Sequence, residues 1–134
     1  MDAETEAVVD VDEIVIPKAM AKPVALKYVR SNLLDILREY SVARACIRLA
    51  ENNAKSMSID RLHIEGVIQE AFASSDLKGY FAGAIPALAA RLGLSGADLK
   101  PIIDGKNHFK VGGWDDFTLK QREALLAAMV AGRV

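Results

Sequence analysis

Apolar residues recur every three or four positions along much of the chain, which is the spacing that keeps one side of an α-helix apolar. The longest stripe of this kind covers residues 24–53. Its apolar members are Leu26, Val29, Leu33, Ile36, Tyr40, Ala43, Ile47 and Ala50. Ser31 and Ser41 are residue types that cap helices well, so the stripe predicts either one long helix or two. We expect it to form part of the core and to provide a dimer surface.

The middle of the chain predicts four shorter helices. They cover residues 59–73, 76–83, about 86–92 and 95–104, with Ser58 or Asp60 as the expected N-cap of the first. Pro86 suits the first turn of a helix, where its missing N–H is no loss, and Gly93 suits a C-terminal cap. Ser95 and Asp98 have the S-x-x-D spacing of a capping box, which marks the start of the last of the four.

A different pattern follows in residues 108–117. The pair Gly112-Gly113 separates two short runs that alternate apolar and polar residues, which predicts a two-residue β-hairpin. In the register of that hairpin Lys110 lies opposite Asp115, a mildly favourable pair of opposite charges.

The chain ends in one more predicted helix. Thr118 and Gln121 have the spacing of a capping box for a helix over residues 119–131. The whole pattern predicts a mainly α protein: a single domain of about six helices, with a helix-turn-helix-like pair over residues 87–104 and one short β-hairpin. This domain covers residues 18–134, and residues 1–17 are expected to be a disordered acidic tail and linker.

Charge is divided unevenly between this tail and the remainder of the chain. The first 13 residues hold six carboxylates and no base: Asp2, Glu4, Glu6, Asp10, Asp12 and Glu13. The other 121 residues hold 17 basic and 12 acidic groups, a net charge of +5. A basic body attracts phosphates or an acidic partner. An acidic tail of this kind either screens such a body or remains a solvated arm.

Composition argues against several classes of protein. One cysteine excludes a disulfide framework and a zinc site with four cysteine ligands, and the two histidines lie far apart in sequence. We find no glycine-rich phosphate loop and no Ser/His/Asp arrangement, so we expect no catalytic residues, no metal and no cofactor, and the protein is not expected to be an enzyme. No run of 18 apolar residues and no apolar signal region occur, so a cytoplasmic location without a membrane partner is expected.

Three single residues carry weaker signals. Cys46 lies on an apolar helical stripe and is expected to be a small buried hydrophobe. His63 is expected at the surface or boundary of a helix, with no metal partner at a suitable spacing. Trp114 is expected to be a wedge between the hairpin and the core.

The most informative stretch is residues 87–106, where two short helices are predicted to meet at a tight turn on Gly93. Its apolar residues could lock the two helices at a steep angle, as in a helix-turn-helix. They are Leu88, Leu92, Leu94, Leu99, Ile102 and Ile103.

This stretch resembles the helix-turn-helix of Cro/CI-type (XRE-like) regulators, over about 20 of the 134 residues. The matching residues are Leu88, Ala89, Leu92, Gly93, Leu94, Ser95, Leu99, Ile102, Ile103, Gly105 and Lys106. The resemblance implies that the second helix lies in the DNA major groove. Gly96, Ala97, Lys100 and the loop after Ile103 would then face DNA.

A hairpin directly after the second helix is typical of a winged helix-turn-helix. Alternation along this wing places Lys106, His108 and Lys110 on one face, where they suit contact with phosphates. The predicted DNA-binding residues are therefore Ser95, Gly96, Lys100, Lys106, Asn107, His108 and Lys110.

Other features of the same stretch favour a different function. Pro101 lies inside the predicted recognition helix, and Asp98 brings a negative charge near the phosphates. Residues 95–103 contain no arginine, asparagine or glutamine, the usual readers of bases. Two hypotheses therefore stand: a small non-enzymatic regulator that binds double-stranded DNA, expected as a homodimer, or a protein-interaction module such as an inhibitor, adaptor or assembly factor that binds a protein partner and no nucleic acid.

Overall fold

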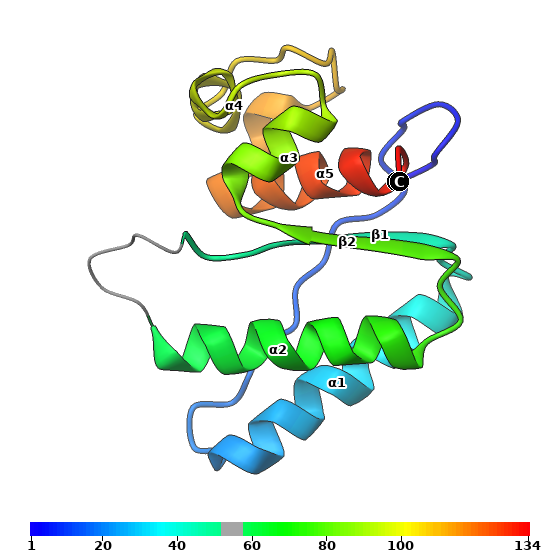
Figure 1. Cartoon of the computed structure of the whole chain (residues 1–134), viewed down its shortest axis with the longest axis vertical. Coiled ribbons are helices and arrows are strands. Elements are labelled where there is room, and N and C mark those ends of the chain that lie inside the picture. Colours follow the sequence, from blue (N-terminus) through cyan, green and yellow to red (C-terminus); the bar gives the residue numbers. More distant parts are fainter. Residues whose placement is uncertain (52–57) are drawn as a thin grey trace.

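The computed structural model describes residues 1–51 and 58–134, and within them the chain forms five α-helices, one 3-10 helix and two β-strands (Figure 1). In chain order these are α1 (Lys22–Glu39), β1 (Arg44–Arg48), α2 (Ile59–Ser74), β2 (Gly79–Gly83), α3 (Ile85–Arg91), α4 (Gly96–Ile103), η1 (Trp114–Asp116) and α5 (Leu119–Ala131). The prediction of a mainly α fold is confirmed in this coarse form.

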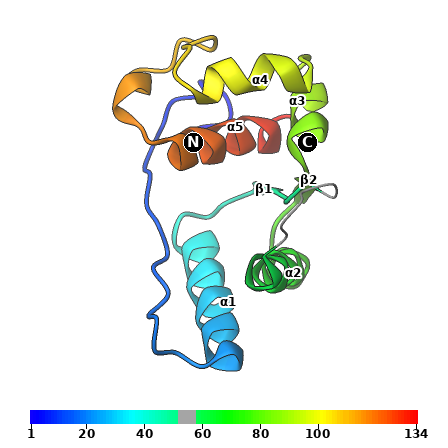
Figure 2. The same cartoon turned by 90° about the vertical axis from the view of Figure 1, so that its left-hand side faces the viewer.

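The elements form three layers (Figures 1 and 2). A two-stranded sheet lies in the middle, with α1 and α2 on one face and α5, α3 and α4 on the other. The strands β1 and β2 are parallel, and Cys46 pairs with Phe81 at the centre of the register. Parallel strands need a crossover connection, and α2 supplies it.

The tightest packing lies on the α3–α5 side of the sheet. The large side chains that are almost completely buried all come from three helices: Leu88, Leu99, Ile102, Leu126, Met129 and Val130. On the other side of the sheet fewer apolar side chains are buried, among them Val29, Leu37 and Phe72. The core of the protein therefore lies around α3, α4 and α5.

Three helices begin at the capping residues that the sequence indicates. The Ser58 side chain accepts the backbone N–H of Arg61 at the start of α2. Ser95 and Asp98 form a reciprocal capping box at the start of α4. Thr118 and Gln121 form a second one at the start of α5. These predictions are confirmed, because a cap depends only on residues three positions apart.

The stripe over residues 24–53 is only partly helical, so the prediction of one or two helices there is wrong in its second half. Helix α1 ends at Glu39, and Ser41 has a left-handed backbone with φ 49°. Residues Arg44–Arg48 then form β1, which lies between helices on both faces and is half-buried after Arg44. Short apolar runs fit helix and strand alike. Residues 52 and 53, the predicted end of the stripe, lie outside the described residues.

The helix predicted over residues 76–83 is likewise wrong, because Gly79–Gly83 forms β2. The described chain thus has five α-helices where about six are predicted. Gly79 and Gly83 are poor helix formers, and Tyr80 and Phe81 favour strands. The strand forms here because β1 offers a parallel partner.

The predicted β-hairpin over residues 108–117 does not form, and neither does its pair between Lys110 and Asp115. A tight type I′ hairpin needs positive φ at both turn residues, but only Gly113 has it, at 73°. Trp114 is buried, and its indole Nε1 donates to the carbonyl of Ile102 at 3.0 Å. This contact holds Trp114–Asp116 as a 3-10 helix against the core.

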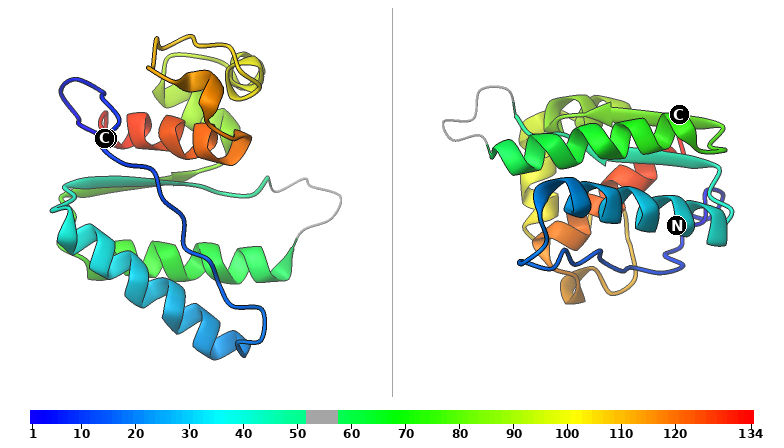
Figure 3. Two further views of the ribbon diagram at one scale, coloured as in Figure 1. Left: turned by 180° about the vertical axis from the view of Figure 1, so that it is seen from behind. Right: turned by 90° about the horizontal axis from the view of Figure 1, so that it is seen from below.

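The N-terminal arm, residues 1–16, passes outside the sheet from α5 to the start of α1 (Figures 2 and 3). A disordered tail is predicted here, but Met1, Val8 and Val11 pack against the hydrophobic core. Two polar contacts add to this attachment: Tyr40 donates to Asp10 at 3.0 Å, and Arg133 pairs with Glu6 at 3.3 Å.

Candidate nucleic-acid interface

Helices α3 and α4 are joined by a short turn at the end of the molecule farthest from α1 (Figures 1 and 2). Gly93 has a left-handed backbone with φ 74°, which glycine adopts without the strain of a Cβ. The backbone N–H of Leu94 donates to the carbonyl of Ala89 at 2.8 Å and closes the turn. In Figure 1, α4 is seen nearly end-on while α3 lies across the picture, so the two helices run in clearly different directions.

The apolar positions of the motif hold this geometry. Leu88, Ala89 and Leu92 of the first helix are buried, as are Leu99 and Ile102 of the second, and none is more than 6% exposed. Both helices also pack against α5. A tightly packed core resists deformation, so the direction of α4 is fixed by the body of the protein.

The opposite side of α4 faces solvent. Ala97, Lys100 and Pro101 are exposed, while Gly96 lies close enough to the first turn of α3 that a Cβ there would be 3.8 Å from Pro86. Pro101 does not end the helix, because the backbone N–H of Asp104 still donates to the carbonyl of Lys100 at 3.0 Å. Small residues in the first turn leave room for the backbone of a bound polymer to approach.

Asp98 is held within its own helix. Its carboxylate accepts the backbone N–H and the hydroxyl of Ser95, both at 2.9 Å. The backbone hydrogen bond from Ser95 is the largest cause that lowers the pKa of Asp98, and the charges of Lys106 and His108 contribute as well. These two side chains therefore lie near the first turn of α4, where they offset the negative charge of Asp98.

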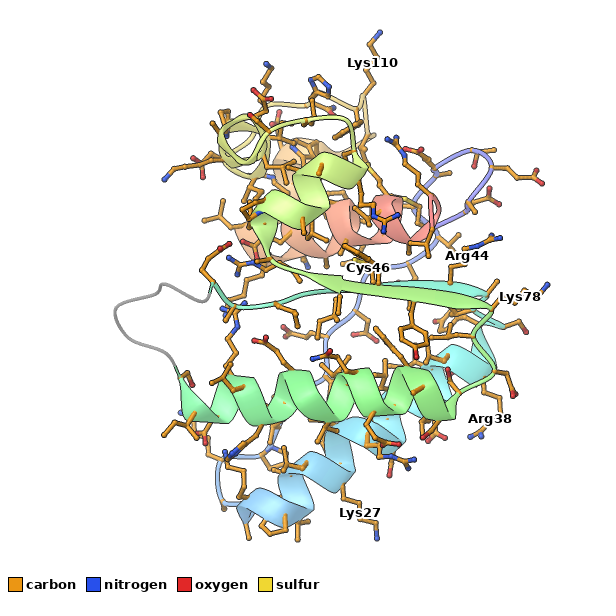
Figure 4. The ribbon with its side chains drawn as sticks, in the orientation of Figure 1. Lys27, Arg38, Arg44, Cys46, Lys78 and Lys110 are labelled. Carbon is orange, nitrogen blue, oxygen red and sulfur yellow. The ribbon has the colours of Figure 1, made fainter. Side chains whose placement is uncertain are left out.

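The loop after α4 presents the remaining predicted residues without a wing. Lys106, His108 and Lys110 are exposed, and Lys110 points away from the body of the protein (Figure 4). Asn107 has a structural role: its amide donates to the carbonyl of Val111 and accepts the backbone N–H of the same residue, both at 2.8 Å. The loop thus supplies three candidate cationic groups, while the side chain of Asn107 braces it from within.

Arg122 is the important residue that sequence reasoning missed. It is only 8% exposed and bonds to no carboxylate; instead it donates to the carbonyls of Trp114, Ile103 and Asp115, at 3.0, 3.0 and 3.3 Å. Its guanidinium carbon also lies 5.9 Å from the centre of the Trp114 ring. Arg122 therefore ties α5 to the end of α4 and to η1. Arg122 lies among polar residues in the first turn of α5, and nothing in that local sequence indicates that its side chain is buried.

The three other residues considered singly from the sequence are Cys46, His63 and Trp114. Cys46 lies on β1, with its side chain toward α5, and burial raises the pKa of its thiol to about 11 (Figure 4). A thiol with so little thiolate near neutral pH is a poor nucleophile. His63 is exposed on α2. Trp114 is buried as a wedge between loop and core, but at a 3-10 helix and not at a hairpin.

Searches against models of known families, curated proteins and solved structures found no match to the chain. Within residues 1–51 and 58–134, no helix combines the length and apolar character needed to cross a bilayer. The same part of the chain contains no group of three His, Cys, Asp or Glu side chains that could hold a metal ion.

Proposed function

We propose that the protein is a small, non-enzymatic DNA-binding regulator in which α4 enters the major groove of double-stranded DNA. The observation that carries this proposal is the α3–α4 pair itself. Five buried side chains and the left-handed turn at Gly93 fix the direction of α4, and its other side remains accessible. A recognition helix has to be rigid on one side and exposed on the other.

Electrostatics supports phosphate contact from the loop more than base contact from the helix. Lys106, His108 and Lys110 come from the loop, while Lys100 is the one cation on α4. Phosphate contacts position a protein on DNA and carry no sequence information. We therefore infer that the loop supplies most of the affinity, and that Lys100 contributes to sequence preference.

The acidic arm opposes this binding. Residues Glu4 to Val8 line the same pocket as the loop residues 109–112, so the arm brings its negative charge to the side of the loop. A negative charge beside a phosphate-binding cation repels the DNA backbone. Deletion of residues 2–12 should therefore tighten binding in a protein that still folds.

The test is a titration of a fluorescently labelled 30-base-pair duplex at several salt concentrations. The double variant Lys106→Ala, Lys110→Ala should weaken binding to every duplex and lower the slope of log affinity against log salt by about 1.8, because each lost phosphate contact removes about 0.9. The matched control Lys18→Ala, Lys27→Ala also removes two exposed lysines. Lys27 lies at the other end of the molecule from Lys110 (Figure 4), and Lys18 comes shortly before α1 in the chain. This control should leave the slope unchanged.

A second pair of variants tests the helix. Ala97→Glu places a negative charge on the exposed side of α4 and should abolish binding, whereas Ala73→Glu, on the exposed side of α2, should have little effect. Lys100→Ala should change the preference among duplexes of different sequence. If the folded wild type binds no duplex, or if both lysine pairs behave alike, the proposal is wrong and the protein-interaction module becomes the better account.

A further inference from the structure

A large groove lies between the N-terminal arm and the body of the protein. The arm passes at a distance from the sheet (Figure 2), and a groove of about 920 Å³ separates it from α1, α2, β1 and α5. That volume is within the range of sites that hold small organic molecules, about 300–1,000 Å³. We call it the arm groove.

The inner walls of the arm groove are apolar. Side chains from α1 and α2 line one end, and side chains from α5 line the other: Leu33, Ile36, Leu37, Ile64, Ile68, Phe72, Ala124, Ala128 and Met129. On α1 and α2, Leu33, Ile64 and Ile68 are half-buried and Ile36 is 36% exposed, whereas Leu37 and Phe72 are buried. Between the two ends lies β1, whose outer edge pairs with no strand among the described residues. The groove thus offers apolar surface that the protein leaves accessible.

The outer wall of the groove is strongly acidic. The arm contributes five carboxylates to the lining: Asp2, Glu6, Asp10, Asp12 and Glu13. Among the residues that the structure describes, Arg44 is the one basic side chain in the lining. Glu6 pairs with Arg133, and Asp10 accepts from Tyr40. The backbone N–H of Glu13 donates to the carboxylate of Asp12 at 2.8 Å, while the Glu13 carboxylate has neither a hydrogen bond nor an ion pair in the part of the chain that the structure describes.

We propose that the arm groove binds a lipophilic organic cation. Its apolar body would cover the side chains of α1, α2 and α5, which gains free energy in proportion to the area removed from water. Its positive group would lie beside the carboxylates of the arm, which attract a cation and repel an anion of the same size. This site is at the sheet edge and does not depend on nucleic-acid binding by α4.

The experiment compares two dyes by fluorescence titration of the full chain: rhodamine 6G, a lipophilic cation, and 1-anilinonaphthalene-8-sulfonate, a lipophilic anion. We expect one equivalent of the cation to bind at least about 10-fold more tightly than the anion at low salt. The variant Asp10→Asn, Asp12→Asn, Glu13→Gln should weaken the cation about 10-fold and leave the anion unchanged or bound more tightly.

The matched control for charge is Glu4→Gln, Asp76→Asn, Asp115→Asn. It removes the same number of carboxylates from exposed positions outside the groove, so cation binding should change less than about 2-fold. If this control weakens the cation as much as the arm variant does, the attraction is a property of net charge and the proposal is overturned. Equal affinity for the two dyes, or binding of neither, overturns it as well.

A steric pair locates the site. Ala124→Trp places a large ring in the groove from an exposed position on α5 and should abolish binding of the cation, while Ala73→Trp lies outside the groove and should not. Sedimentation of the same proteins completes the test. A wild-type dimer that Ala124→Trp dissociates would mean that a second copy of the chain covers the groove, and would overturn the proposal.

Discussion

Replacement of Arg122 by alanine should destabilise the protein strongly, although the substitution removes no ion pair. Arg122 donates to three backbone carbonyls, those of Trp114, Ile103 and Asp115. A buried acceptor that loses its partner costs about 1–3 kcal/mol, and hydrogen bonds from a charged donor are at the upper end of the range. The carbonyl of Trp114 also accepts the backbone N–H of Phe117 at 3.3 Å, and Asp115 is an exposed residue whose carbonyl water can reach, so the carbonyl of Ile103 carries most of the cost.

We therefore expect Arg122→Ala to lower the free energy of unfolding by about 2–4 kcal/mol. A protein of this length loses about 3–4 °C in its thermal midpoint per kcal/mol, so the midpoint should fall by about 6–16 °C. Arg122→Lys keeps the charge but has a single nitrogen, which cannot reach three separate carbonyls at once. It should lose about half as much.

Urea unfolding measures this directly, because Trp114 is the sole tryptophan of the chain and reports on the site. Far-ultraviolet circular dichroism reports on the helices as a whole. Lys120→Ala, at an exposed position on the same helix, is the control and should change stability by less than about 0.5 kcal/mol. A loss below about 1 kcal/mol for Arg122→Ala would show that the three carbonyls do not depend on this side chain, and the reasoning would fail.

Three further predictions concern single residues. A Cβ added at Gly93 or at Gly66 would have no described atom within 4 Å beyond the adjoining residues and the backbone of its own helix, but of the two only Gly93 has a positive φ. Gly93→Ala should therefore lower the free energy of unfolding by about 1–2 kcal/mol, and Gly66→Ala should raise it by about 0.5–1 kcal/mol. Changes of the same sign in urea unfolding would refute this. Since burial raises the pKa of Cys46 from 9.0 to about 11, a thiol reagent at pH 8 should label the native protein about 100-fold more slowly than the urea-unfolded chain, and equal rates would contradict the burial. The raised pKa also means that this thiol favours the folded state below pH 9.0 and that the contribution fades as the pH rises toward 11. The backbone hydrogen bond from Ser95 lowers the pKa of Asp98, so this carboxyl should titrate below 3.8 by NMR. The capping box should then stabilise α4 above that pH. A titration midpoint at 3.8 or higher would mean that the hydrogen bonds of the capping box do not form in solution.

The sequence predicts those features of the candidate interface that depend only on residues close together in the chain. The buried positions Leu88, Leu99 and Ile102 and the turn at Gly93 follow from spacing, because each depends on neighbours within one or two helical turns. The arrangement of the loop cations did not follow from the sequence. An alternating hairpin was expected for Lys106 and Lys110, whereas the loop is held by Asn107 and by the docking of Trp114.

The sequence by itself determined where three of the helices begin. Ser58, Ser95 and Thr118 start α2, α4 and α5, because a side-chain cap reaches a backbone N–H only three residues away. Tertiary structure alone decided the rest. Residues Arg44–Arg48 and Gly79–Gly83 became strands because they pair with each other, with α2 as the connection between them. No local pattern specifies a pairing between segments so far apart in the sequence. Arg122 was buried for the same kind of reason: the three carbonyls that accept its hydrogen bonds come together only when α4, η1 and α5 pack against one another.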